Sequence, residues 1–128
     1  MALHDQLPIH KTGVDLLALA VRVQEQMPRS MKRQLGEKIF THCVQMLDLM
    51  ALANASRAHE RAAYIEQLLR EQRALAVLLR VGHQARYIAT PLWAQTVELL
   101  ESIGKQGGGW LKSAARLQHD GHGHHARA

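Results

Sequence analysis

The 128-residue sequence contains a single cysteine, Cys43, and few aromatic residues: one Phe, two Tyr and two Trp. A lone cysteine excludes an intrachain disulfide and a thiolate metal cluster. Because Cys43 stands among apolar residues such as Ile39 and Met46, we predict a buried core thiol rather than a nucleophile. Leu and Ala dominate the composition and β-branched residues are sparse, which favours helix throughout.

Long apolar runs are also missing. No segment approaches the roughly 20 uninterrupted apolar residues of a membrane span, and the acidic, histidine-bearing N-terminus lacks a signal-peptide layout. We therefore expect a cytoplasmic protein that does not contact a membrane. The length fits one domain with one modest core, which we divide into a flexible arm (1–10), a helical bundle (11–118) and a disordered His-rich tail (119–128).

Apolar residues at steps of three and four predict four helices. The first ends at Pro28, the second spans residues 31–53, the third runs to Gly82 with Ser56 as candidate N-cap, and the fourth starts at Thr90-Pro91 with Thr90 as N-cap. Short connections make consecutive helices antiparallel neighbours. We therefore predict an all-α, antiparallel up-down four-helix bundle.

A glycine triplet, Gly107 to Gly109, interrupts the fourth helix. The triplet is either a loop between two short helices or part of one continuous or slightly kinked helix. We favour the continuous helix because the apolar stripe resumes in phase after the glycines. Each glycine costs a helix about 1 kcal/mol relative to alanine, so we expect another backbone packed close to the triplet, with Trp110 as the anchor.

The pattern I-G-K-x-x-G-G-W-L-K-S, which includes Gly104, the triplet and Trp110, resembles the fourth helix of the accessory variability determinant family of diversity-generating retroelements. Three further segments match in order: Met27-Pro28-Arg29-Ser30 with Leu35-Gly36-Glu37, Leu75-Ala76-Val77-Leu78-Leu79-Arg80, and Thr90-Pro91. The resemblance covers residues 10–118. Gln106 and Gly107 depart from it, since the family often has two large apolar residues there. The proteins encoded in intervening sequences of large-subunit ribosomal RNA genes share much of the pattern and remain an alternative.

The family resemblance implies a homopentameric barrel. It also implies that the protein binds the reverse transcriptase and the structured template RNA of the element, and supports mutagenic complementary-DNA synthesis without doing chemistry or using a cofactor. Surplus apolar residues on the second helix, Phe40, Leu47 and Leu49, independently suggest contacts between subunits.

The net charge of +5 and the pI of about 9.9 favour polyanionic partners. Eleven basic residues are candidate contacts to nucleic acid or to a partner: Arg29, Lys32, Arg33, Lys38, Arg70, Arg73, Arg80, Arg86, Lys105, Lys112 and Arg116. Each cluster could instead be a solvated helix face. Aromatic residues are absent among them, so we predict phosphate contacts to RNA, with DNA as a second polyanion, rather than base stacking.

Arg57, Arg61 and Arg86 share the azimuth of the apolar stripe of the third helix, at its two ends. We expect them either to cap the ends of the bundle or to reach a neighbouring subunit.

No catalytic constellation is evident, and we predict a protein that is not an enzyme. Arg116 and His122 match the loose spacing of some helical RNases, but His122 lies in a Gly-His segment that would not hold it for acid-base work. A small RNase and a purely structural oligomer are the competing hypotheses. The histidines of the tail could bind Zn or Ni adventitiously; a disordered tail without a functional metal site is the expectation we adopt.

Overall fold

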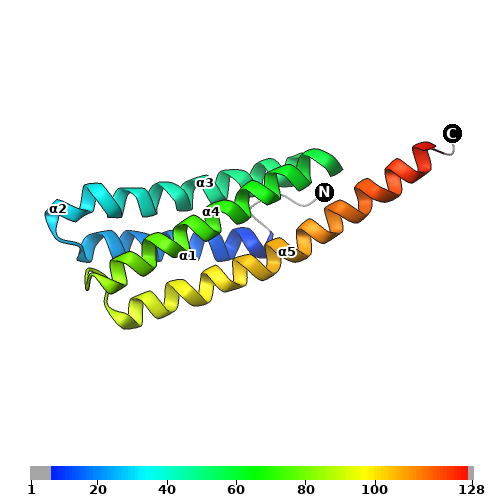
Figure 1. Ribbon diagram of the computed structural model, residues 1–128. Helices are drawn as coiled ribbons and strands as arrows, with labels where there is room; N and C mark the ends of the chain where they lie inside the picture. The colour runs from blue at the N-terminus through cyan, green and yellow to red at the C-terminus, as the bar shows by residue number, and fades with distance from the viewer. Residues whose placement is uncertain (1–6, 127–128) are drawn as a thin grey trace.

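The computed structural model describes the backbone of residues 7–126 and the side chains of residues 7–116. This part of the chain is helical without a strand, and its long helices form an antiparallel bundle, as predicted (Figure 1). The elements are α1 (Pro8–Gln26), the short α2 (Arg29–Met31), the π-helical turn η2 (Lys32–Gly36), α3 (Glu37–Ala55), α4 (Ala58–Gln84) and α5 (Thr90–Ala126).

Each long helix packs against two others. Helix α1 contacts α3 and α5, and α4 contacts the same two helices on the other side. The core between them contains mainly aliphatic side chains and methionines, with Leu16, Val23, Ile39, Met46, Met50, Leu68, Leu75, Leu79 and Ile103 almost completely buried. Cys43 lies in this core, so the prediction of a buried core thiol is confirmed, and burial raises the pKa of this thiol to about 12.

The ends of the chain differ from our expectation. Helix α1 begins at Pro8, so residues 8–10 are helical rather than part of an arm. Proline suits the first helical turn because its missing N–H would have no partner there. The backbone of α5 continues as helix to Ala126, through most of the segment for which we predicted a disordered tail. Residues 1–6 and 127–128 lie outside the described part of the chain.

Both capping predictions are wrong. Arg57 is the N-cap residue of α4, whereas Ser56 closes α3: its hydroxyl donates to the carbonyl of Leu52 at 2.6 Å. A serine hydroxyl can bond back to the carbonyl four residues earlier, and here that bond takes precedence over capping. Helix α5 begins at Thr90 itself, because the N–H of Trp93 donates to the carbonyl of Ala89.

Arg61 caps the end of α3. Its Nε donates to the carbonyl of Ala53 at 2.9 Å and its Nη2 to that of Asn54 at 3.2 Å. These carbonyls belong to the last turn of α3, which lacks the i+4 N–H donors of the helix interior; the carbonyl of Ala53 also accepts from the N–H of Ser56 at 3.3 Å. Of the two roles predicted for this arginine, the structure therefore gives it the capping role.

Helix α5 runs without a break through the glycine triplet, as predicted. The close approach is limited to Gly107, where a Cβ atom would lie 2.8 Å from Cδ2 of Leu69. A Cβ atom at Gly108 or Gly109 would have no atom of the described structure within 4 Å, apart from its own helix and chain neighbours. Our expectation of a backbone against the whole triplet is therefore wrong: one glycine is covered, and a leucine side chain of α4 covers it.

Gln106 replaces the large apolar residue of the family pattern by a polar link between helices. Its amide donates to the hydroxyl of Thr12 on α1 at 3.1 Å and to that of Ser102 at 3.0 Å. Trp110 is partly buried one turn later, where it packs against both clusters of the core. The junction of α1 and α5 thus rests on a hydrogen bond and an aromatic ring.

Across residues 7–126, no helix combines the length and the apolar character that crossing a membrane requires.

Candidate nucleic-acid interface

All eleven basic residues predicted to contact a partner have exposed side chains. The structure brings six of them to one end of the bundle, which we call the basic end and define as residues 22–38 and 77–97. Packing holds these two segments together, since Gly36 lies against Gln24, and Gly82 against Leu35. Figure 1 shows α2, the end of α4 and the start of α5 at this end.

The basic end carries most of the positive charge of the described chain. It holds seven basic residues and only Glu25 and Glu37 as acids, a formal charge of +5. The basic residues are Arg22, Arg29, Lys32, Arg33, Lys38, Arg80 and Arg86. The remaining residues with described side chains have eight basic and seven acidic side chains, a formal charge of +1. A positive potential is therefore focused at one end rather than spread over the surface.

These cations have no carboxylate partner. Within residues 7–116, the ion pair that forms joins His42 of α3 to Glu71 of α4, away from the basic end. Exposed cations that are not neutralised by the protein can release counterions from nucleic acid when they meet its phosphates. The basic end therefore has the electrostatic properties of a phosphate-binding surface.

The turn η2 carries two of these cations, Lys32 and Arg33, on a π-helical segment. Gly36 at the end of this turn is buried, and a Cβ atom there would lie 2.8 Å from Cγ of Gln24 on α1. The glycine thus allows the turn to pack directly on α1. Single π-helical turns occur often at functional sites, and this one projects its basic residues into solvent at the end of the bundle.

Arg86 lies in the connection between α4 and α5, not on the helix stripe as the azimuth count implied. It adopts a left-handed backbone conformation with φ of 66°. Its N–H donates to the carbonyl of His83, and that of Tyr87 to the carbonyl of Gly82, which forms the Schellman motif that ends α4. Glycine is the usual residue at such a position; an L-residue there costs about 1–2 kcal/mol.

The other predicted residues do not join the basic end. Arg70 and Arg73 lie on the exposed face of α4 outside the basic end, and Lys105, Lys112 and Arg116 lie further along α5. The sequence analysis missed Arg22, which the reversal of the chain at Pro28 brings to the basic end together with α2. The charge of Arg22 was visible in the sequence, but its position beside η2 depends on the packing of α1.

The described side chains contain no group of three or more His, Cys, Asp or Glu that could hold a metal ion. The histidines at positions 119, 122, 124 and 125 lie outside the described side chains, as does the pairing of Arg116 with His122. The predictions about a metal-free tail and about an RNase pair therefore stay predictions.

The fold and the surface define a small four-helix-bundle protein with one strongly basic end. The bAvd-like family model matches residues 8–114, which include α1 to α4 and the first 25 residues of α5. The chain belongs to this family of bacterial accessory variability determinants. Neither the curated proteins nor the solved structures contain a match to the chain.

Proposed function

We propose that this protein is the accessory subunit of a diversity-generating retroelement and that it binds template RNA and the reverse transcriptase of the element without doing chemistry itself. Membership of the bAvd-like family supports the accessory role. The observation that carries the RNA contact is the formal charge of +5 at the basic end. Phosphates are the groups that this surface would bind, so DNA formed during synthesis could bind there too.

Base stacking would add little at this surface. Trp93 of the basic end already stacks on His83, with ring centroids 4.1 Å apart, and Tyr87 is partly buried. A contact made through phosphates is tolerant of sequence and sensitive to salt. We therefore expect recognition to depend on the shape and charge of the RNA rather than on its bases.

Removing three cations from the basic end should weaken RNA binding. The variant is Arg29→Gln with Lys32→Gln and Arg33→Gln, and the measurement is a salt titration of a fluorescent RNA hairpin by anisotropy. Each lost phosphate contact lowers the slope of log affinity against log salt by about 1, so we expect a slope smaller by about 2 to 3. Affinity at physiological salt should fall by about tenfold or more.

The matched control removes the same charge elsewhere on α5, outside the basic end: Lys105→Gln with Lys112→Gln and Arg116→Gln. Equal losses in the two triple variants would show that net charge alone governs binding, and would contradict a basic-end interface. Arg86→Gly adds an independent control, because glycine adopts the left-handed backbone conformation at this position without the steric strain of an L-residue. It should keep or raise the melting temperature while it lowers RNA affinity.

We propose further that the chain assembles as a homopentameric barrel. Apart from the valines of α4, large apolar side chains remain exposed on two helices of the single chain: Val14 and Val21 of α1 are 45% and 40% exposed, and Phe40 and Leu52 of α3 are 37% and 46% exposed. Exposed apolar surface of this kind often marks a subunit contact. Native mass spectrometry at micromolar concentration should give five chains per particle, and a monomer would contradict the proposal.

The reverse transcriptase partner is tested by co-purification of this chain with the reverse transcriptase of the retroelement to which the proposal assigns it. Complementary-DNA synthesis on the template RNA should require both proteins. Template RNA that stays intact in the presence of this protein alone would fit an accessory role, whereas its cleavage would support the RNase hypothesis.

A further inference from the structure

The outer face of α4 combines exposed valines with arginines. Arg70, Arg73, Val77, Arg80 and Val81 fall within an arc of about 100° on this helix, and we call them the valine–arginine face. Val77 is 60% exposed and Val81 is 49% exposed, the largest values among the exposed large apolar side chains of the described structure. Two valines one turn apart among arginines form a surface patch that is both apolar and positively charged.

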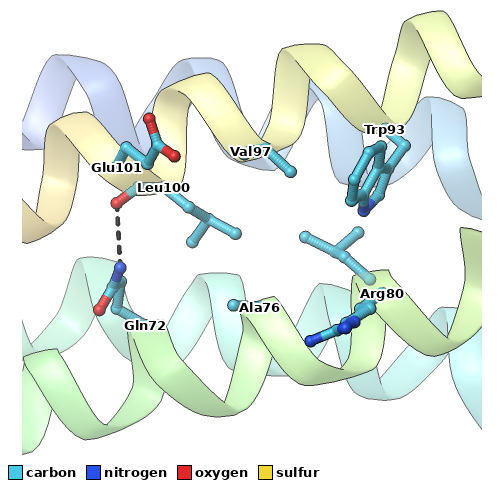
Figure 2. Close-up of a pocket in the computed structure, with 8 residues that line it drawn as sticks. Gln72, Ala76, Arg80, Trp93, Val97, Leu100 and Glu101 are labelled. Carbon is cyan, nitrogen blue, oxygen red and sulfur yellow. Dashed lines mark hydrogen bonds between the residues drawn. The ribbon is translucent and has the colours of Figure 1, made fainter.

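A groove between α4 and α5 borders this face, and Arg80 is the residue that the face and the groove share. It has a volume of about 240 Å³, and its lining includes Ala76 and Leu79 of α4 and Val97 and Leu100 of α5. Figure 2 shows the apolar centre between the two helices. The amide of Gln72 donates to the carbonyl of Leu100 at 3.1 Å and ties the helices together at one end of the groove.

Charged residues stand on both sides of the groove. Arg80 belongs to its α4 wall and Glu101 to its α5 wall. The lining is otherwise almost entirely apolar, with Trp93 at the end opposite Gln72 (Figure 2). The groove is therefore apolar along its centre, with the cation Arg80 on the α4 side and the anion Glu101 on the α5 side. Such a groove suits a helix that presents apolar side chains along one face and charged side chains beside them.

The valines argue against nucleic acid as the occupant of this face. Phosphates offer nothing that would remove Val77 and Val81 from water, whereas apolar side chains of a protein would do so. Within the basic end, α2 and η2 carry no valine, whereas Val77 and Val81 lie where its α4 segment meets the valine–arginine face. The two surfaces therefore share Arg80 and adjoin each other, but they differ in the partner that the rest of each surface suits.

The arginines indicate the charge of the occupant. Across the described residues, none of the side chains of Arg70, Arg73 and Arg80 makes an ion pair or a hydrogen bond. Helix α4 has no acid after Glu71, and Glu71 is itself bound to His42. A two-fold contact of this face with the same face of a second copy would place like charges together, which opposes that mode of association.

We propose that the valine–arginine face and the adjoining groove bind an acidic amphipathic helix of a protein partner. Its apolar residues, spaced at i, i+3, i+4 and i+7, enter the groove and cover Val77 and Val81, and its carboxylates meet Arg70 and Arg73. The inference rests on the proposed function for the existence of a protein partner, and it adds where that partner binds and which chemistry its segment must have.

The test uses a fluorescein-labelled helical peptide of about 18 residues, with leucines on one face and glutamates on the other. Binding to the full-length protein is measured by anisotropy. One control peptide has the same composition in an order that destroys the apolar face, and a second has lysine in place of glutamate. We expect the acidic amphipathic peptide to bind at least about tenfold more tightly than either control.

Two variants of the protein locate the site. Val77→Ser with Val81→Ser removes the apolar contact, and Arg70→Gln with Arg73→Gln removes two charges outside the basic end. Each should weaken peptide binding, the first by about tenfold or more and the second by about threefold or more. Affinity for the RNA hairpin should stay within about twofold in the Arg70→Gln, Arg73→Gln variant, because these two residues lie outside the basic end. The Lys105→Gln, Lys112→Gln, Arg116→Gln variant should bind the peptide as the parent does.

Three results would overturn the inference. The first is that the acidic peptide binds no better than the control peptide of rearranged sequence. The second is that the valine variant loses RNA affinity in proportion to peptide affinity, which would make nucleic acid the occupant. The third is that the oligomer of the valine variant dissociates in native mass spectrometry, which would make a second copy the occupant. Failure of the peptide to bind while the reverse transcriptase still co-purifies would remove this site and leave the proposed function intact.

Discussion

Leu75→Ala is expected to lower the free energy of unfolding by about 2–5 kcal/mol. Leu75 lies on α4 with its side chain completely buried in the main core. Truncation removes apolar contacts and leaves a cavity that the neighbouring helices fill only in part. Urea unfolding followed by circular dichroism measures the change.

Val77→Ala is the matched control, because Val77 lies two residues further along the same helix and is 60% exposed. It should change the free energy of unfolding by no more than about 0.5 kcal/mol. Similar losses at the two positions would mean that the helix is rotated in the folded protein, and would contradict the packing on which both proposed surfaces depend.

Gly107→Leu should destabilise the protein by about 1–3 kcal/mol, although leucine is the better helix former. A Cβ atom at this position would lie 2.8 Å from Cδ2 of Leu69 and 3.8 Å from Cδ1 of Ile9, so the longer side chain has to displace both. Its effect is read from thermal melts, together with the oligomeric state.

Gly108→Leu separates packing from helix propensity. The Cβ atom there would have no neighbour within 4 Å beyond its own helix and adjacent residues. We expect this variant to be more stable than the parent by up to about 1 kcal/mol. A loss at Gly108 as large as that at Gly107 would show that another surface covers this glycine, contrary to the geometry of the single chain.

The two proposed surfaces divide the basic residues by their surroundings. On α2 and η2 of the basic end, cations stand on short segments without large exposed apolar side chains, which suits a hydrated contact to phosphates. On α4, Arg70 and Arg73 accompany Val77 and Val81 beside an apolar groove, which suits a protein. A subunit built in this way could hold RNA at one end while a protein segment occupies its side.

The sequence by itself determined the helical class, the number of long helices, the break at Pro28 and the burial of Cys43. These properties are local or periodic: proline breaks a helix in its interior, and a stripe of apolar residues must face a core wherever that core lies. The same holds for the continuity of α5, because the phase of its apolar stripe survives the glycines. The order of the short motifs was also sufficient to identify the family.

Only the tertiary structure decided which glycine of the triplet is covered, which arginines lie together and which helix end Ser56 caps. Gly107 is covered and Gly108 is open because α4 packs against only one side of α5. The sequence pattern does not show which of three consecutive glycines faces that side. Arg22, Arg29 and Arg86 share an end because the chain reverses twice between them, whereas Arg70 lies on another surface. Ser56 closes α3 rather than starting α4 because two short-range hydrogen bonds compete and the packed helices select one of them.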